Sequence, residues 1–328
     1  MVVLDSLLVN LVMLVDSIPT PPPTPRSGRG RPAVYSDRLF LKALVIMIVK
    51  RLYRVHTLYT VLEEPTAQMR ALRATLSQDG CYPSRRTFDR RLSQLPETLP
   101  AQIGALGRHL VRLLKPWTET GRAAALDSTV FRARGGVWHK KDRERAHVPH
   151  TRIDTEAHWT KSGYHGWVYG WKLHLAVTVS SVWIPLAACL KAANEADNLA
   201  APELLRELPH QTRFVLGDTH YNAPNVEKAC FGRGIFLIAS GRRGPYPHID
   251  SGVEVRRVFH KLRSVANENF NEQFKAIFDG HEQVPTKGLK ATQRYGLGAV
   301  LVYQLSLFYR HKQGLTLRKG LKSFLRAA

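Results

Sequence analysis

Three carboxylates, Asp127, Asp218 and Glu268, stand where the sequence can bring them to one site. Asp127 follows the apolar run AAAL and Asp218 follows FVLG, so each lies at or near the end of a predicted buried strand. In open α/β sheets, ligands collect in the crevice beyond the strand ends. Two acids delivered there from separate strands can hold hard divalent cations, which prefer oxygen ligands. For either Asp alone, the alternative is a turn or capping role.

The third acid lies on a predicted helix with the sequence SVANENFNEQFKAIFD. Glu268 and Lys275 are seven residues apart, so they lie within about 20° of each other and roughly 10 Å apart along the axis. A carboxylate and an ammonium group therefore share one surface of the helix. By spacing alone, Glu272 is an equally good candidate, and an ordinary exposed face is the alternative. The predicted buried face holds Phe270, Phe274, Ile277 and Phe278.

The order of Asp127 in LDST, Asp218 in LGDTHY and Glu268 in NENFNEQFK resembles the DDE transposases of bacterial insertion sequences. Their glutamate helix reads Tyr, two residues, Arg, three residues, Glu, six residues, Lys, and this sequence keeps Glu268 and Lys275 at that spacing. It departs at the other two positions, which hold Lys261 and Ser264. Arg263 lies one residue from the expected Arg, and on a continuous helix we expect it to point toward the apolar side. The resemblance covers roughly residues 120 to 310.

The resemblance implies metal-dependent DNA strand nicking and strand transfer at the terminal inverted repeats of a mobile element. Asp127, Asp218 and Glu268 would then be the catalytic residues and would bind two Mg²⁺ or Mn²⁺ ions, because three converging carboxylates repel one another unless cations hold them. Lys275, Arg263 and Lys172, in the strand-like YGWKLHLAV, are expected to contact DNA. Two alternatives remain: a transposase-derived DNA-binding protein that does not cut, and an RNase H-like nuclease.

The composition independently favours a nucleic-acid partner. The 328 residues include 48 Lys or Arg and 26 Asp or Glu, a net charge of +22, while 44% hydrophobic residues suffice for a packed core. Apolar runs such as 43–49 are too short to span a membrane, and the first eighteen residues lack a basic n-region. The widely spaced Cys81, Cys189 and Cys230 offer no disulfide framework, so we expect a reducing cytoplasm. The family resemblance implies in addition a bacterial, nucleoid-associated protein.

The elements that must position these groups fall into three predicted regions: an apolar helix with a Pro-rich linker and basic arm at 1–32, a helical DNA-binding region at 33–120, and an RNase H-like catalytic domain at 121–328. The last is expected to be an α/β mixed sheet flanked by helices, with a polar insertion at about 131–166 and a basic tail after Glu282. Strands are predicted at 123–126, 169–179, 184–190, 214–216 and 235–239.

Two further segments are candidates for contacts with double-stranded DNA, both repeat ends and target. The arm RSGRGRP, with Arg29 and Arg31, suits a narrow minor groove, or is only a flexible linker. In PSRRTFDRRLSQL, Ser84 can cap a helix that buries Phe88, Leu92 and Leu95. Its other surface is a DNA-recognition face or a solvated one, and carries Arg85, Arg86, Arg90 and Arg91.

The insertion is rich in His and Trp. The spacing of its histidines disfavours a zinc site, while Trp138, Trp159 and Trp167 can stack on an exposed base or pack within the loop. Pairing two DNA ends generally requires two copies of the protein, so we expect a homodimer or a higher assembly on DNA.

Overall fold

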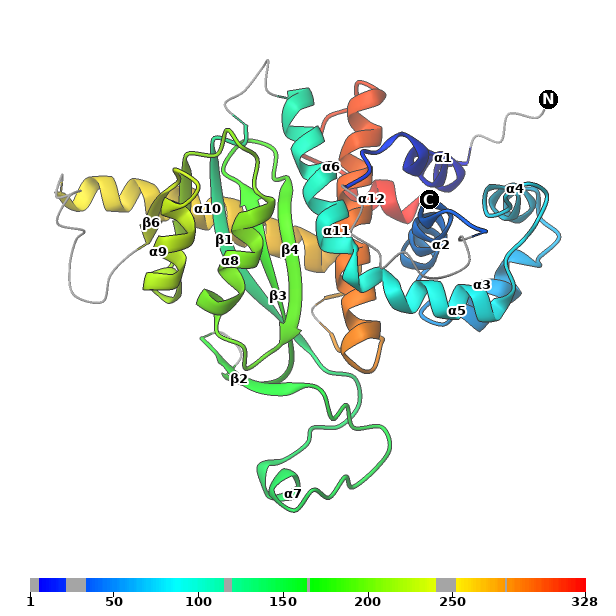
Figure 1. The fold of residues 1–328 in the computed structure, drawn as a ribbon, viewed down its shortest axis with the longest axis horizontal. Helices are drawn as coiled ribbons and strands as arrows, with labels where there is room; N and C mark the ends of the chain where they lie inside the picture. The colour runs from blue at the N-terminus through cyan, green and yellow to red at the C-terminus, as the bar shows by residue number, and fades with distance from the viewer. Residues whose placement is uncertain (1–5, 22–33, 115–119, 164–165, 240–251, 281) are drawn as a thin grey trace.

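The computed structural model describes residues 6–21, 34–114, 120–163, 166–239, 252–280 and 282–328, with side chains omitted at 252–256. A helical region precedes a mixed sheet that helices flank on both faces (Figure 1). The arm that contains Arg29 and Arg31 lies outside the described residues.

Three helices of the N-terminal region begin at side-chain caps. Ser6, Thr66 and Ser84 each accept a hydrogen bond from the backbone N–H three residues ahead, which satisfies a donor that the helix itself leaves unpaired. The predicted Ser84 cap and the buried Phe88 and Leu92 are confirmed. The helices are α1 (Leu7–Leu14), η1 (Val15–Ser17), α2 (Asp37–Val49), α3 (Val55–Leu62), α4 (Ala67–Thr75), α5 (Arg85–Gln94), η2 (Leu95–Glu97) and α6 (Leu99–Leu114).

Six strands form one mixed sheet: β1 (Ala123–Arg132), β2 (His158–Ser162), β3 (Gly166–Thr178), β4 (Pro185–Ala192), β5 (Phe214–Gly217) and β6 (Phe236–Ala239). Their order is β2-β3-β1-β5-β6, and β4 pairs with β3 beside β2. β3 runs antiparallel to β1, whereas β5 and β6 run parallel to it. An antiparallel meander extended by parallel strands on its other side is an RNase H-like topology, which confirms the predicted fold class.

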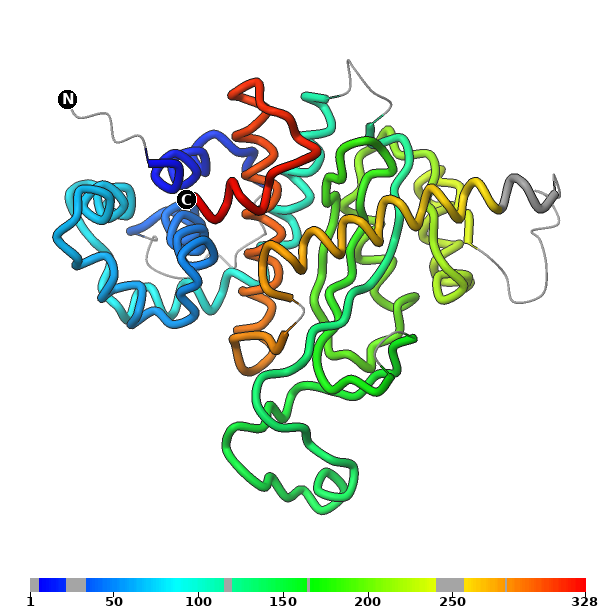
Figure 2. The backbone as a smooth tube through the Cα atoms, turned by 180° about the vertical axis from the view of Figure 1, so that it is seen from behind, coloured from blue at the N-terminus to red at the C-terminus, as the bar shows by residue number. Residues whose placement is uncertain are grey.

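Helices cover both faces of this sheet. α8 (Asp197–Glu207) and α9 (Pro224–Phe231) lie on one face, and α10 (Gly252–Phe278) crosses the other (Figures 1 and 2). The short η4 (Thr219–Tyr221) connects β5 to α9. α10 contacts β1, β3 and β5, so it passes directly over the centre of the sheet.

The basic stretch after Glu282 is not a tail. Most of it forms α11 (Leu289–Lys312), which is buried on nearly every side, followed by α12 (Leu321–Arg326). Gly296 lies against Leu190 of β4 and Gly298 against Leu44 of α2, so a side chain at either glycine would require those leucines to shift. The Gln304 amide donates to the carbonyls of Ile103 and Pro185 at 2.9 and 2.8 Å. α11 therefore joins the helical region to the sheet.

The insertion projects from the lower end of β1 and β3, away from the rest of the protein (Figure 1). It contains α7 (Lys140–Glu144) and β2, so part of the expected loop is regular structure. Within the described residues, no helix is both long enough and apolar enough to cross a membrane.

Candidate active site

Asp127 and Asp218 lie where the parallel part of the sheet ends. β1 continues to Arg132, so Asp127 lies within its strand and not at the predicted end. The neighbouring β5 stops at Gly217, and its last pairing with β1 joins Leu216 to Ala125. Asp218 follows immediately, at the carboxyl end of β5, and is close enough to Asp127 to raise the pKa of its carboxyl.

α10 turns two asparagines toward β1 at Asp127. Neither was among the residues predicted from the sequence. The Asn271 amide donates to Asp127 Oδ2 at 3.0 Å, and the Asn267 amide donates to the Leu126 carbonyl at 3.1 Å. Their spacing of four residues, which places both on one side of a helix, could have indicated them from the sequence. The Oδ1 atoms of both asparagines are buried and have no hydrogen-bond partner among the described residues. Two carboxamide oxygens thus lie beside Asp127 with free acceptor capacity.

Burial governs the charge of Asp127. The pKa of its carboxyl is raised from 3.8 to about 6, chiefly by desolvation, and the charges of Asp218 and Asp197 act in the same direction. The Arg263 guanidinium and a hydrogen bond from the Ser128 backbone N–H act in the opposite direction. Because burial disfavours the ionised form of this carboxyl, a nearby cation would stabilise it.

Arg263 lies on the side of α10 that faces the sheet, within about 20° of the buried Phe270, so it is on the apolar side where the sequence predicted it. It lies one helical turn before Asn267 and is half-buried, and its charge is the largest influence lowering the pKa of Asp127. This side of α10 is therefore partly polar where it passes Asp127.

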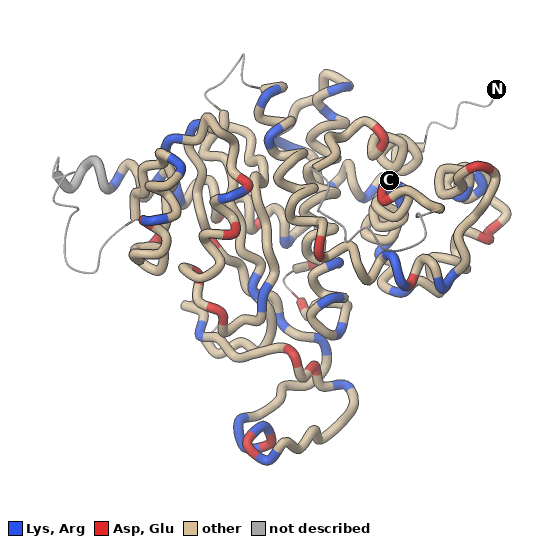
Figure 3. Tube along the Cα trace, in the orientation of Figure 1, with Lys and Arg blue, Asp and Glu red and all other residues tan. Residues whose placement is uncertain are grey.

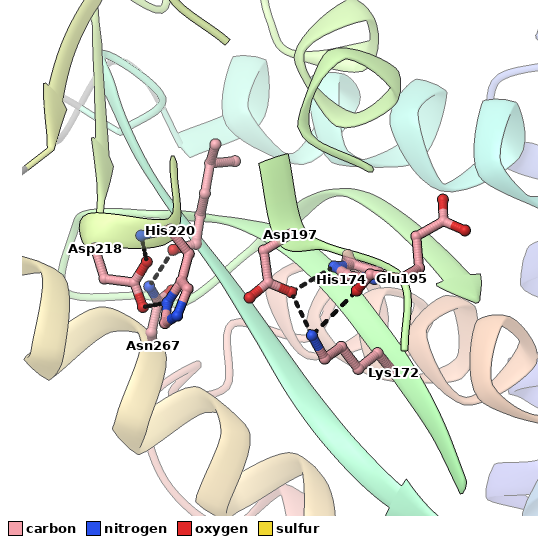
Figure 4. A network of polar contacts seen from close by, with 8 residues as sticks. Lys172, His174, Glu195, Asp197, Asp218, His220 and Asn267 are labelled. Carbon is pink, nitrogen blue, oxygen red and sulfur yellow. Dashed lines mark hydrogen bonds and ion pairs between the residues drawn. The ribbon is translucent and has the colours of Figure 1, made fainter. Parts of the chain in front are cut away.

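Asp218 is held by its own turn. Its Oδ1 accepts from the His220 backbone N–H at 2.9 Å, and the His220 ring lies 3.3 Å from Oδ2 (Figure 4). The next residue, Tyr221, is fully buried, and its hydroxyl has no partner among the described residues. Burial raises the pKa of Tyr221, and the charges of Asp197, Asp127 and Asp218 add to that rise.

A second polar network lies on the opposite face of the sheet. Lys172 Nζ donates to Asp197 Oδ1 and to the Glu195 carbonyl, both at 3.1 Å, and the His174 ring lies 3.4 Å from Asp197 (Figure 4). Burial lowers the pKa of His174 to about 4, so the ring is neutral. Lys172 was predicted to contact DNA, but here it is 13% exposed and neutralises a buried carboxylate.

Glu268 and Lys275 lie on the flank of α10 next to the Asn271 face. Glu268 is exposed, about 100° around the helix from Asn267. Lys275 lines a cleft of about 360 Å³ at the end of β1, together with Val130 and Arg132. Burial lowers the pKa of Lys275, while Glu272 and Asp127 raise it. Among the described side chains, no three His, Cys, Asp or Glu residues converge as a metal-binding group.

The arginines of α5 divide into two kinds. Arg85, Arg86 and Arg90 are exposed, as a DNA-contacting surface requires. Arg91 instead pairs with Asp37 of α2 and lies 4.6 Å above the Phe40 ring. Three of the four predicted contacts are therefore available at the surface, and the fourth holds α5 against α2.

An RNase H-like sheet with two acids at the end of its parallel strands defines a class of metal-dependent nucleic-acid enzymes. The sequence model of one family, described as Transposase DDE domain, matches residues 119–303, more than half of the chain. The protein therefore belongs to the DDE transposase family, whose members generally catalyse phosphoryl transfer. No curated protein sequence matches the chain.

Three solved structures show distant similarity. A pre-cleavage Mos1 transpososome and a Mos1 paired-end complex with the left transposon end are each 12% identical, with TM-scores of 0.20 and 0.22. A Mos1 mariner paired-end complex with Mn is 14% identical, with a TM-score of 0.21. Each similarity covers 86% of this chain and 80% or 81% of the other. Similarity at this level says nothing about the site of this chain.

Proposed function

We propose that the protein is the transposase of a bacterial insertion sequence, catalysing metal-dependent strand cleavage and strand transfer at the element's terminal inverted repeats. The observation that carries the proposal is the placement of Asp127 and Asp218 together at the end of the parallel strands, beneath α10, in a chain of the DDE family. The exposed Glu268 on the adjacent flank of α10 would complete the acidic set.

The oxygen donors around Asp127 and Asp218 suit Mg²⁺ or Mn²⁺. Asp127 and Asp218 offer carboxylates, and Asn267 and Asn271 offer buried carboxamide oxygens without partners among the described residues. Two such ions, when bound, would activate the attacking oxygen and stabilise the leaving oxygen of an in-line displacement. Asn271 would fix the orientation of Asp127 through its hydrogen bond, because an oriented carboxylate binds without further ordering.

Basic side chains would hold the DNA around these acids. Lys275 lines the cleft at the end of β1, and Arg263 lies near Asp127, so both would meet phosphates close to the scissile bond. Arg85, Arg86 and Arg90 of α5 would contact the duplex of the repeat at a distance from that bond. We propose that two or more copies assemble on paired ends and that the protein works in the bacterial cytoplasm.

A cleavage assay tests the proposal. Purified protein is incubated with duplex DNA that carries the inverted repeats flanking its own gene, with Mg²⁺ or Mn²⁺. We expect a nick at the repeat end, and joining of the released 3′-hydroxyl to a second duplex. If the protein binds the repeats specifically but never nicks them in either metal, the transposase proposal is wrong.

One observation favours a second candidate, a DNA-binding protein without cleavage activity: Glu268 is exposed, and no three acidic side chains converge among the described residues. Specific binding without nicking, in the same assay, is the result this candidate requires. A nuclease that cuts without joining would instead support the RNase H-like alternative.

Asn271→Ala should weaken metal binding. Losing the hydrogen bond to Asp127 leaves its carboxylate unoriented, so the affinity for Mn²⁺ should fall about 10- to 100-fold, as for other residues that support metal ligands. Paramagnetic resonance measures free Mn²⁺ directly, without turnover. Asn269→Ala is the matched control, because the Asn269 amide bonds only within its own helix, to Val265. Equal affinities in both variants would remove Asn271 from the site.

A further inference from the structure

The insertion holds a pocket that lies apart from the catalytic acids. Its volume is about 760 Å³, and its walls are His139, Lys140, Arg143, Glu144, Trp159 and Trp167. The lining residues come from α7 and its N-cap His139 and from the β2–β3 ribbon. Figure 1 shows α7 at the far end of the projection and β2 at its base.

The ribbon presents its aromatic rings on one side. Trp159 pairs with Tyr169 and Trp167 pairs with Lys161, so strand alternation places all four side chains on the same face. Trp159 is fixed, because its indole N–H donates to the Trp138 carbonyl at 3.1 Å and its ring lies 5.3 Å from that of Tyr169. Trp167 is 67% exposed. The pocket thus combines an anchored ring with one that has an uncovered face.

Charged side chains surround these rings, and their sum is positive. Lys140, Lys141 and Arg143 lie on α7 with the acids Asp142 and Glu144, and Lys140 pairs with Glu144 at 3.7 Å. Lys161 adds a further positive charge on the ribbon (Figure 3). Arg143 is positioned 5.7 Å from the Trp138 ring and 3.3 Å from His158 Nδ1. Trp138, in turn, donates to the His147 carbonyl at 2.8 Å and has a packing role. A ligand with a flat aromatic surface and an adjoining anionic group matches this arrangement, and a nucleotide has both.

The base of the projection is tied to the domain. The buried Asp154 accepts from the Gly288 backbone N–H at 2.8 Å, and Glu156 accepts from that of Leu289 at 2.8 Å. Both donors lie at the start of α11, which runs through the centre of the protein. The pocket therefore has a fixed relation to the catalytic acids.

The register of β3 gives the distance from Trp167 to the position of Asp127. Leu175 of β3 pairs with Asp127, and Trp167 precedes Leu175 by eight positions on the same strand. At about 3.4 Å per residue, the separation is roughly 27 Å. Stacked nucleotides rise ~3.4 Å each, so a stacked strand that follows β3 from Asp127 would place roughly its eighth nucleotide at the pocket.

We propose that this pocket binds an unpaired nucleobase of the DNA, with its phosphate against α7, about eight nucleotides from the scissile bond. The proposal rests on the proposed function in one respect, that the protein acts on DNA. In a duplex the ring faces are covered by neighbouring bases, so only an extruded or single-stranded base can stack between Trp159 and Trp167.

Binding of two probes to the full-length protein tests this inference by fluorescence anisotropy: a single strand of thymidines and a blunt duplex of equal length. We expect Trp167→Ala to weaken single-strand binding about 5- to 150-fold, the range for loss of one stacked base, and to change duplex binding less than twofold. Trp167→Phe should retain most of the affinity, because it keeps a ring. Phe231→Ala, which removes an 87% exposed ring on α9, is the control and should change neither.

The outcomes distinguish a failure of the proposed function from a failure of the pocket inference. If wild-type protein binds neither probe, the proposed function fails. If it binds the duplex but Trp167→Ala leaves single-strand binding unchanged, or lowers both affinities equally, the pocket inference fails and the proposed function stands. A melting temperature within a few degrees of wild type for each variant confirms that the comparison is between folded proteins.

Discussion

Asp127→Asn should abolish cleavage while leaving DNA binding intact. Removing a carboxylate ligand forfeits several kcal/mol of charge stabilisation in the transition state, so we expect the nicking rate to fall at least about 1000-fold. The neutral side chain can still accept from Asn271, so the fold around it should persist. Asp142→Asn on the insertion, a matched change far from α10, should cut normally. Normal cleavage by Asp127→Asn would remove this residue from the site.

The same substitution should stabilise the metal-free protein. The pKa of Asp127 is raised from 3.8 to about 6 in the folded state, so the folded protein binds this proton more tightly than the unfolded chain. Above about pH 6 the ionised carboxylate therefore costs the folded state about 3 kcal/mol, and the cost vanishes below about pH 4. Denaturant unfolding without divalent ions should show Asp127→Asn more stable at pH 7.5, with the gain lost on acidification. Lower stability at neutral pH would contradict this account.

The second large effect concerns which glutamate on α10 is catalytic. We expect Glu268→Gln to reduce nicking at least about 100-fold with unchanged repeat binding, because the neutral amide is a poor ligand for a hard cation. Glu272→Gln should stay within a few-fold of wild type. Both residues are exposed and lie one turn apart, so each controls for the other's effect on the helix.

The reverse pattern would move the acidic role to Glu272, which is close enough to Lys275 to raise its pKa. Loss of cleavage in neither variant would leave Asp127 and Asp218 without a third acid on α10. Measuring each rate at several Mn²⁺ concentrations separates weakened metal binding from a slower chemical step.

Most of the sheet could be predicted from local pattern. The predicted strands at 169–179, 184–190, 214–216 and 235–239 lie within one to three residues of β3, β4, β5 and β6, because short apolar runs bounded by polar or Gly residues fix their length. β1 was predicted at 123–126 but runs to Arg132. The part of β1 beyond the prediction begins with Asp127, Ser128 and Thr129. Polar residues after an apolar run indicate the end of a strand unless the neighbouring elements are known.

The burial of the long helix after Gly288 also could not be predicted from local sequence. Basic residues and the absence of acids suggested a solvated tail, yet α11 is buried over most of its length. Periodicity gives a helix its faces, but it cannot identify the neighbours that will cover them. For α11 these are α2, α6 and β4, which are distant in the sequence.

Local sequence identified the candidate groups: the order of Asp127, Asp218 and Glu268, the basic charge, and the strands that carry the two aspartates. The arrangement of those groups follows from tertiary packing. The rotation of α10 turns Asn267, Asn271 and Arg263 toward Asp127, and an ion pair with Asp197 at the start of α8 engages Lys172. Side-chain identity is local, whereas the facing of a helix against a strand depends on packing between residues more than a hundred positions apart.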